Sequence, residues 1–544
     1  MTNSIFNIPT PGNEPIFPYN DQDFNKKILK DHLELMSSKE IEIPLIIAGE
    51  EIKTGKTATN VMPHNHKHVL CTYHQATAKE INMAIKASME AKKSWEKMAW
   101  QDRASIFLRA AELLANKYRP ILNAATMLGQ SKNVYQAEID SACELIDFWR
   151  FNPKYMEKLY AEQPPISPVG MWNRVEARAL EGFIFAITPF NFTSIAGNLP
   201  TAPAMMGNTV VWKPASSAVY SAYYIMQILK EAGLPDGVIN FIPCRGSDMG
   251  NTVVTNPDFA GVHFTGSTEV FQGIWKDVGL NIDKFKTYPR IVGETGGKDF
   301  IFAHKSADEA VVQTAMVRGA FEYQGQKCSA ASRAYIPESI WNNIKSGFLS
   351  DVESLKMGDV MDFRNFVNAV IDKSAFKNIT SYIDYAKNDP DSEIIAGGEY
   401  DDSVGYFIKP TVILAKKPDT KTMQEEIFGP VLTLYVYNDA DFEKTLDICD
   451  NTSPYALTGA ILANEREAIN IAYDKLTHAA GNFYINDKPT GAVVGQQPFG
   501  GSRASGTNDK AGSMLNLQRW VSQRTVKENF NPPTSYEYPF MEAE

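Results

Sequence analysis

The ten residues Phe183-Ile184-Phe185-Ala186-Ile187-Thr188-Pro189-Phe190-Asn191-Phe192 decide the fold class, because a continuous apolar run leads directly into a turn signal. Such a run is typical of a strand buried on both faces of a parallel sheet. Further apolar runs cover residues 209–212, 238–242 and 262–264, with helical stretches between them. The clearest helical stretch, residues 217–232, is stopped by Gly233 and Pro235. This alternation predicts an α/β fold with a helix-covered parallel sheet.

Ligands of such sheets bind beyond the carboxyl ends of the strands. The residues after the four runs, at positions 188–192, 213–216, 243–246 and 265–268, are therefore the candidate site. Gly266-Ser267-Thr268 ends a strand and opens a predicted helix, whose free N–H groups would attract a phosphate. Lys213 would reach a ribose or phosphate, or is a solvated strand-end charge. Neither common nucleotide motif is present, since G-x-G-x-x-G does not occur and residues 293–298 are one residue short of a P-loop.

A second alternating region, residues 300–485, predicts a second α/β domain. We expect strands at 333–336 and 431–436, and helices near 308–323, 338–353, 372–387 and 465–476. Before the first sheet we expect helices at 102–117 and 134–151. The first 40 residues are predicted to form an arm around the body, with a charged helix over 21–37. Residues 520–544 are rich in Pro and Tyr and are a candidate arm for a partner subunit.

Composition restricts the classes of partner. A net charge of −11 argues against nucleic acid, which needs a concentrated basic surface. The chain lacks a run of about 18 apolar residues, so no membrane span is expected. The first 20 residues resemble neither a signal peptide nor a transit peptide, so a cytoplasmic location is the default expectation. Five widely spaced cysteines fit a reducing compartment. The histidines of 64–68 follow Pro63 and are predicted to lie in an exposed turn without a metal.

The stretch Gln324-Gly325-Gln326-Lys327-Cys328-Ser329-Ala330-Ala331-Ser332-Arg333 places a cysteine beside a lysine in a turn of small residues. A thiolate is the nucleophile, and an adjacent cation is expected to lower the thiol pKa. The alternative is an inert buried cysteine at the start of a strand. Two distant side chains bear on the choice, because Asn191 and Glu294 supply an amide and a carboxylate to accompany the Cys328 thiol. Together they suit covalent aldehyde oxidation, in which the thiolate attacks, the amide holds the oxyanion and the carboxylate activates water.

At this point the chain resembles the aldehyde dehydrogenase superfamily over about residues 50–525. The matching stretches, in the same order and spacing, are 188–192, 212–214, 264–268, 294–298, 325–329, 426–431 and 498–501. The resemblance implies a Rossmann-type NAD-binding domain, an α/β catalytic domain and a small oligomerisation flap. The expected division is an N-terminal arm at 1–40, the NAD-binding domain at 41–157, 182–293 and 487–516, the catalytic domain at 294–486, and the flap at 158–181 and 517–544.

The resemblance also implies roles for individual residues. Cys328 would be the nucleophile, Asn191 and the Cys328 N–H the oxyanion hole, and Glu294 the base for water. NAD is the implied cofactor, with its ribose, pyrophosphate and nicotinamide contacts at Thr188, Lys213, Ser216, Gly266, Ser267, Thr268, Glu426 and Phe428. Many NAD-specific relatives carry a glutamate where Ser216 stands, which weakens the case against NADP. No arginine lies in residues 213–220 to bind a 2′-phosphate, so NAD remains the expectation.

Within the superfamily the segments 136–148, 325–330 and 491–508 are most similar to members that oxidise glutamate γ-semialdehyde to glutamate in proline catabolism. The implied carboxylate site consists of Lys327, Ser329, Gly491 and Ala492, although family members often carry serine where Ala492 stands. Phe192 and Phe499 would enclose the aliphatic stem. Glu144 would face the ammonium group, or is a helix-surface carboxylate. Another ω-semialdehyde, such as succinic semialdehyde, is the rival substrate.

The same resemblance implies a homodimer or larger homo-oligomer. It also implies a possible transient contact with a proline dehydrogenase, which would supply the substrate. A mitochondrial matrix location is the alternative to the cytoplasmic one if a presequence has been removed.

Overall fold

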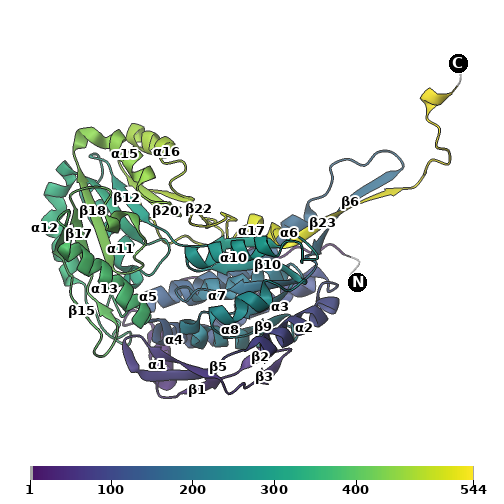
Figure 1. Ribbon diagram of the computed structural model, residues 1–544, viewed down its shortest axis with the longest axis horizontal. Coiled ribbons are helices and arrows are strands. Elements are labelled where there is room, and N and C mark those ends of the chain that lie inside the picture. The colour runs from purple at the N-terminus through teal and green to yellow at the C-terminus, as the bar shows by residue number, and fades with distance from the viewer. Residues whose placement is uncertain (1–3, 543–544) are drawn as a thin grey trace.

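The computed structural model describes residues 4–542 and contains two seven-stranded sheets (Figure 1). The first has the order β11-β10-β7-β8-β9-β2-β3, and the strands from β11 to β9 are parallel. Its strands are β2 (Leu45–Ile47), β3 (Glu50–Ile52), β7 (Phe183–Ile187), β8 (Thr209–Lys213), β9 (Ile239–Phe241), β10 (Phe259–Thr265) and β11 (Arg290–Glu294). The four strands predicted from apolar runs are thus confirmed as neighbours in one parallel sheet.

Both faces of this sheet are buried, as a continuous apolar strand requires. Ile184 and Ala186 of β7 point into one hydrophobic cluster, and Phe183 and Phe185 point into another. The first cluster is covered by α3 (Trp100–Leu113), α4 (Arg119–Gln130), α6 (Leu145–Ala161), α7 (Thr193–Met205) and α8 (Val219–Ala232). The second is covered by α2 (Ala78–Trp95), α9 (Gly246–Val253) and α10 (Thr268–Leu280). Each strand therefore delivers its carboxyl end to an edge between two helix layers.

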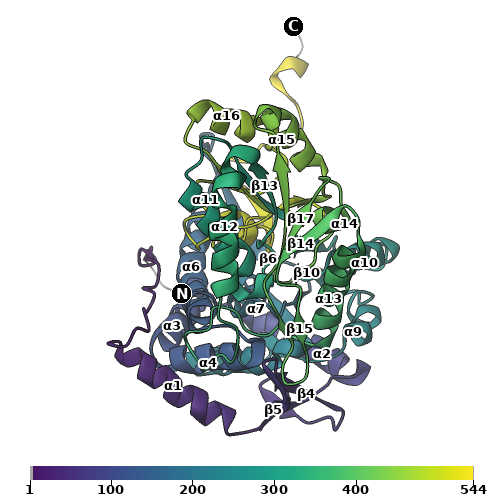
Figure 2. The same cartoon turned by 90° about the vertical axis from the view of Figure 1, so that its left-hand side faces the viewer.

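The second sheet has the order β14-β17-β18-β13-β12-β20-β21, and only β14 is antiparallel to its neighbour. Its strands are β12 (Asp299–Ala303), β13 (Ala331–Pro337), β14 (Ser392–Ala396), β17 (Thr411–Ala415), β18 (Val431–Tyr437), β20 (Thr458–Leu462) and β21 (Asn482–Ile485). The helices around it are α11 (Glu309–Phe321), α12 (Glu338–Ser354), α13 (Lys373–Asn388), α15 (Phe442–Asn451) and α16 (Arg466–Lys475) (Figure 2). The predicted second α/β unit is confirmed.

Two helices differ from the sequence prediction. The helix predicted over 102–117 ends at Leu113, and a π-helical turn, η1 (Leu114–Tyr118), joins it to α4. The helix predicted over 134–151 consists of α5 (Val134–Ala137), the π-helix η2 (Glu138–Glu144) and α6, which continues through Pro153 to Ala161. A proline removes one helical hydrogen bond. Here the buried face of Trp149, Asn152 and Met156 crosses the proline, so packing maintains the helix.

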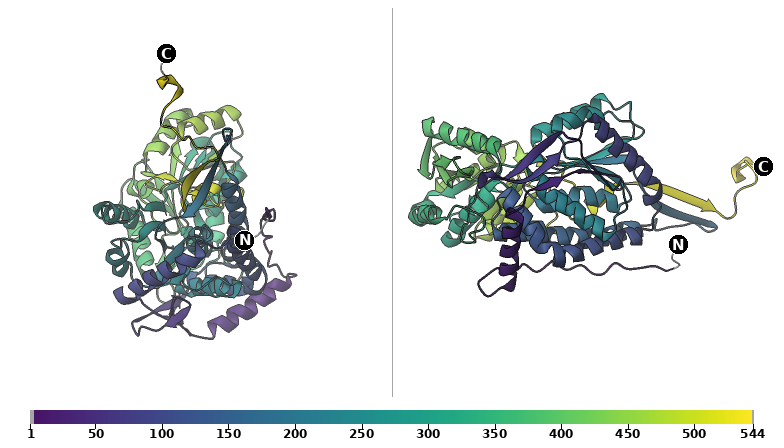
Figure 3. Two further views of the ribbon diagram at one scale, coloured as in Figure 1. Left: turned by 90° about the vertical axis from the view of Figure 1, so that its right-hand side faces the viewer. Right: turned by 90° about the horizontal axis from the view of Figure 1, so that it is seen from below.

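A two-stranded antiparallel ribbon projects from the body (Figure 1). It pairs β6 (Met171–Ala179) with β23 (Val521–Asn529), and the chain leaves it toward the C-terminus. At the other end of the chain, residues 4–23 run as an extended segment along the outside of the body before α1 (Phe24–Ser37) (Figure 3). We call residues 4–23 the leading segment. Among the described residues, no helix is long and apolar enough to cross a bilayer.

The prediction of an exposed turn at 64–68 is wrong for His64. This side chain is buried where β4 (Thr57–Met62) meets β5 (Asn65–His74), and its Nδ1 lies 3.2 Å from the Ser131 hydroxyl. Residues 402–406 cover the hairpin, since Val404 accepts from the His66 N–H. Burial lowers the pKa of His64 to about 4, so the ring is neutral at pH 7. Within residues 4–542 no cluster of His, Cys, Asp and Glu is placed to hold a metal.

Candidate active site

Cys328 lies at the end of a tightly folded turn between α11 and β13. Tyr323, Gln324 and Gly325 are all left-handed, with φ of 52°, 54° and 65°. A Cβ on Gly325 would lie 2.1 Å from the Gly429 carbonyl oxygen, so only glycine fits. The two non-glycine residues cost about 1–2 kcal/mol each in this conformation. Hydrogen bonds offset that cost: Tyr323 Oη donates to the Gln130 carbonyl, and Gln324 Nε2 donates to the carbonyls of Ser131 and Ala369.

Asn191 approaches this turn from the first sheet. It follows β7 and is 3% exposed, and its Nδ2 donates to the Gln326 carbonyl at 3.1 Å. The amide therefore lies against the backbone two residues before Cys328. The predicted pairing of a strand-end amide with the cysteine turn is thus present in the fold.

One cavity of about 820 Å³ joins most of the predicted catalytic and substrate residues. It contains Cys328 and Glu294 together, although they come from different sheets. The predicted residues that line it are Glu144, Phe192, Glu294, Lys327, Cys328, Ser329, Gly491, Ala492 and Phe499. A site of this volume has room for a small substrate.

The expectation that Lys327 lowers the Cys328 thiol pKa is wrong for this structure. Burial raises the pKa of the thiol well above its ordinary value, and the carboxylates of Glu294 and Asp299 raise it further. The Lys327 ammonium instead forms an ion pair with Glu322 at 2.9 Å. The lysine charge is therefore paired with a carboxylate that also lines the cavity.

Glu294, at the end of β11, is the carboxyl group that shares the cavity with the thiol. Burial raises the pKa of this carboxyl to about 8, with an opposing contribution from Lys510 and a reinforcing one from Asp509. A base with this pKa is largely protonated at pH 7 and becomes available as the pH rises through about 8. Buried carboxyls of this kind are typical of acid–base sites.

Positive charge gathers on one wall of the cavity. Burial tends to raise the pKa of Glu322, but the ammonium groups of Lys327 and Lys488 hold it below its ordinary value. Arg318 adds a further cation near the same carboxylate and also lines the cavity. The single carboxylate of Glu322 is therefore shared by several cations, and this wall of the cavity keeps an excess of positive charge. The sequence analysis missed Arg318 and Lys488, because neither lies within a motif.

Carboxyl groups also line the cavity. Glu144 lines the cavity and accepts from Ser194 Oγ at 2.8 Å, so it is not the helix-surface carboxylate of the alternative interpretation. Burial and the nearby Asp140 raise the pKa of Glu144 to about 8. Asp140 itself pairs at 2.7 Å with the fully buried Lys132, whose ammonium lies 4.2 Å from the Phe192 ring centroid. These last two charges also escaped the sequence analysis.

The predicted cofactor residues lie outside the lining of this cavity and gather at the strand ends. The Thr188 N–H donates to the Lys213 carbonyl at 3.2 Å, which joins the ends of β7 and β8. Lys213 Nζ is buried and donates to the Pro214 carbonyl, and burial lowers its pKa. Ser216 Oγ donates to the Cys244 carbonyl at 3.5 Å.

The remaining cofactor candidates surround the start of α10 and the facing sheet. Gly266 precedes the helix, Ser267 caps it, and Thr268 Oγ1 accepts from the Gly296 N–H at 3.4 Å. Glu426, from the second α/β unit, accepts from the Gly297 N–H at 2.8 Å. Phe428 has a φ of 57°, and its ring packs edge-on against Phe190 at 5.9 Å. The N–H groups at the start of α10 and the Lys213 ammonium as donors, with the Glu426 carboxylate as acceptor, are polar groups that fit a dinucleotide.

Comparisons with known proteins agree with this geometry. The sequence model described as the aldehyde dehydrogenase family matches residues 51–526. The "Delta-1-pyrroline-5-carboxylate dehydrogenase, mitochondrial" of Dictyostelium discoideum is 56% identical over 537 residues, covering 98% of this chain and 96% of that protein. The "Delta-1-pyrroline-5-carboxylate dehydrogenase" of Agaricus bisporus is 52% identical, and the match covers 98% of each chain. A solved Delta-pyrroline-5-carboxylate dehydrogenase from Mycobacterium tuberculosis, bound with NAD, superimposes with a TM-score of 0.96, 49% identity and 100% coverage of both chains.

Proposed function

This chain belongs to the aldehyde dehydrogenase family, and from that premise we propose that it oxidises L-glutamate γ-semialdehyde to L-glutamate with NAD. This aldehyde is the open form of Δ1-pyrroline-5-carboxylate, and its oxidation is the closing step of proline catabolism. The observation that carries the substrate is the arrangement of charge around Cys328. Cations gathered around Glu322 and the carboxyl group of Glu144 line the same cavity, which supplies both charges that a zwitterionic amino acid requires.

We assign the chemistry to three side chains. Cys328 Sγ attacks the aldehyde carbon as a thiolate, while Asn191 Nδ2 and the Cys328 N–H stabilise the oxyanion. When bound, NAD supplies the acceptor for the hydride whose loss converts the Cys328 adduct into a thioester. The Glu294 carboxylate then removes a proton from the water that hydrolyses this thioester. For the cofactor we assign Lys213 and Glu426 to the riboses and the Gly266–Thr268 turn to the pyrophosphate, with Thr188, Ser216 and Phe428 beside them.

The substrate assignments follow these charges. Lys327, Ser329 and the N–H groups of Gly491 and Ala492 take the α-carboxylate. Glu144 takes the α-ammonium, which would draw the proton from its carboxyl group because opposite charge lowers a carboxyl pKa. Phe192 and Phe499 enclose the aliphatic stem. Steady-state assay with pyrroline-5-carboxylate and NAD tests the substrate, and kcat/KM no better than with succinic semialdehyde would refute it.

Lys327→Met is expected to raise KM for glutamate semialdehyde roughly 10- to 100-fold, because a charged hydrogen bond is worth about 1.5–3 kcal/mol. KM for an uncharged aldehyde such as propanal should change little. Lys345→Met, on the exposed face of α12, is the matched control and should alter neither. An equal loss for both aldehydes would mean that Lys327 acts on the thiol instead of the carboxylate.

Glu144→Ala separates the two candidate substrates. We expect KM for glutamate semialdehyde to rise about tenfold or more, since the ammonium loses a charged partner. Succinic semialdehyde lacks the ammonium, so its KM should stay within about twofold. The measurement is the ratio of the two KM values in wild type and variant. A parallel change for both substrates would remove Glu144 from the recognition of the ammonium.

The assembly and location are also proposals. The β6–β23 ribbon exposes Trp172, and Val169 is exposed just before it; we assign the ribbon to a flap that pairs with another copy in a homodimer or larger oligomer. We retain the predicted division into arm, NAD-binding domain, catalytic domain and flap, and a transient contact with proline dehydrogenase. Names of eukaryotic relatives favour the mitochondrial alternative over the cytoplasm.

A further inference from the structure

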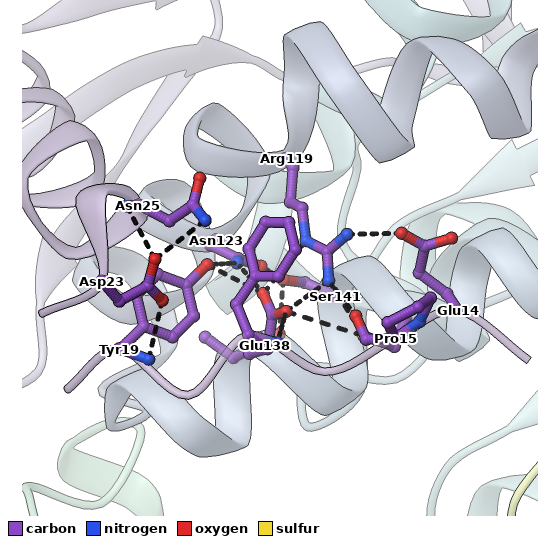
Figure 4. A network of polar contacts seen from close by, with 12 residues as sticks. Glu14, Pro15, Tyr19, Asp23, Asn25, Arg119, Asn123, Glu138 and Ser141 are labelled. Atoms are coloured by element: carbon purple, nitrogen blue, oxygen red, sulfur yellow. Dashed lines mark hydrogen bonds and ion pairs between the residues drawn. The ribbon is translucent and has the colours of Figure 1, made fainter.

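The leading segment is held against the body by a buried ionic network (Figure 4). Arg119 and Glu138 are 2% and 0% exposed and form an ion pair with each other. Arg119 also contacts the leading segment, at Glu14 Oε1 (2.5 Å) and the Pro15 carbonyl (2.6 Å). Glu138 accepts from Tyr19 Oη at 2.9 Å. Buried charges are costly unless they are fully paired, so this network holds the leading segment in a fixed position on the body.

Asn13 extends the contact of the leading segment with the body toward the cavity. Its Nδ2 donates to Asp147 Oδ2 at 2.8 Å and to the Val494 carbonyl at 2.7 Å. Its Oδ1 accepts from Gln496 Nε2 at 3.0 Å. One amide thus joins α6 to residues 491–497, which we call the carboxylate loop. Asn13, Glu14 and Ile16 also line the cavity that contains Cys328.

Gly491 and Ala492 of the carboxylate loop line the cavity. Gly491 has a φ of +101°, which L side chains rarely adopt. The Val493 N–H donates to Gln497 Oε1 and the Val493 carbonyl accepts from the following turn, which fixes the far end of the loop. Within residues 4–542, no protein group accepts from the N–H groups of Gly491 and Ala492. These donors are therefore available to an anion, provided that the loop keeps its shape.

We propose that the leading segment is part of the substrate site, and that Asn13 is a positioning residue that holds the carboxylate loop in its donating conformation. The proposal rests on the proposed function for the identity of the anion, the substrate α-carboxylate. Two contacts of the Asn13 side-chain amide with this loop support it. Asn13 holds the Val494 carbonyl directly, and Gln496 closes the contact from the loop side. Residues more than 480 positions apart in the chain thereby form one wall.

The test compares Asn13→Ala with Asn7→Ala, a matched change at an exposed position of the same segment. Asn13→Ala should raise KM for glutamate semialdehyde about five- to tenfold, as the loss of hydrogen bonds that hold the loop predicts. Its kcat and its KM for propanal should stay within about twofold. Gln496→Ala should reproduce the effect, and the double variant should be no worse than either single one. Equal losses for both aldehydes, or additive losses, would overturn the proposal.

Hydrogen exchange provides a readout that does not depend on the substrate. Amides in the carboxylate loop should exchange at least threefold faster in Asn13→Ala than in wild type or Asn7→Ala. Unchanged exchange would refute the positioning role even if KM rose. If wild type failed to turn over glutamate semialdehyde, the proposed function would fail alone, because faster exchange in Asn13→Ala would still support the role of Asn13.

Discussion

Cys328→Ala should reduce kcat for glutamate semialdehyde by about 10⁴-fold or more, because removal of the nucleophile eliminates the covalent route. The cavity around the sulfur is already formed by neighbouring backbone and by the hydrogen bonds of Tyr323 and Gln324. Alanine fits this space, so the turn should keep its shape. The measurement is NADH formation under saturating substrate and NAD.

The control is Cys449→Ala, which removes a buried thiol on α15 outside the cavity lining. This variant should retain most of the wild-type kcat. Binding of NAD to Cys328→Ala, followed by protein fluorescence, should also remain within about threefold of wild type. Substantial turnover by Cys328→Ala would exclude a thioester mechanism, and loss of NAD binding would show a structural defect instead.

The main elements of the fold are predictable because their signals are local. Residues 183–187 are apolar without interruption, and the structure buries alternate side chains in two different clusters. The continuation of α6 through Pro153 has no such local signal. It depends on packing of Trp149 and Met156 against other helices, which the sequence near the proline does not record.

The residues of the candidate site also divide into those that the sequence predicts and those that it does not. Asn191 follows one strand of the first sheet, Glu294 ends another, and Cys328 lies in the turn before a strand of the second sheet, so motif and topology together predict their meeting. Burial of Cys328, reinforced by the Glu294 carboxylate, reverses the expected direction of the thiol pKa shift, and Lys327 pairs with Glu322. Arg318 and Lys488 carry no motif of their own. The resemblance, rather than spacing, supplied the cofactor residues and the carboxylate loop.

The lack of a local sequence signal also explains why the leading segment was predicted only as an arm. Its prolines indicate an extended chain, but nothing near Asn13 indicates a contact with Val494. The leading segment is also held by a network whose charges come from α4 and η2, and each of those charges alone is an ordinary surface residue in the sequence. Only the fold shows that they are buried together.

Glu294→Gln should lower steady-state kcat by about 10²- to 10⁴-fold, the usual contribution of a general base, while the first turnover remains fast. The amide cannot take the proton of the hydrolytic water, so the thioester should accumulate on Cys328. Rapid mixing should therefore show a burst of NADH close to one per active site, followed by slow turnover. A slow first turnover without a burst would place Glu294 before the hydride transfer.

The pH dependence tests the same assignment in the wild-type protein. Because burial raises the pKa of Glu294 to about 8, the basic carboxylate form increases as the pH rises through that value. Thioester hydrolysis should rise about tenfold per pH unit below pH 8 and level off above it. Asp509 raises this pKa by its charge, so Asp509→Asn should move the midpoint to lower pH. In Glu294→Gln the midpoint should disappear, and a midpoint that persisted unchanged there would assign the titration to another group.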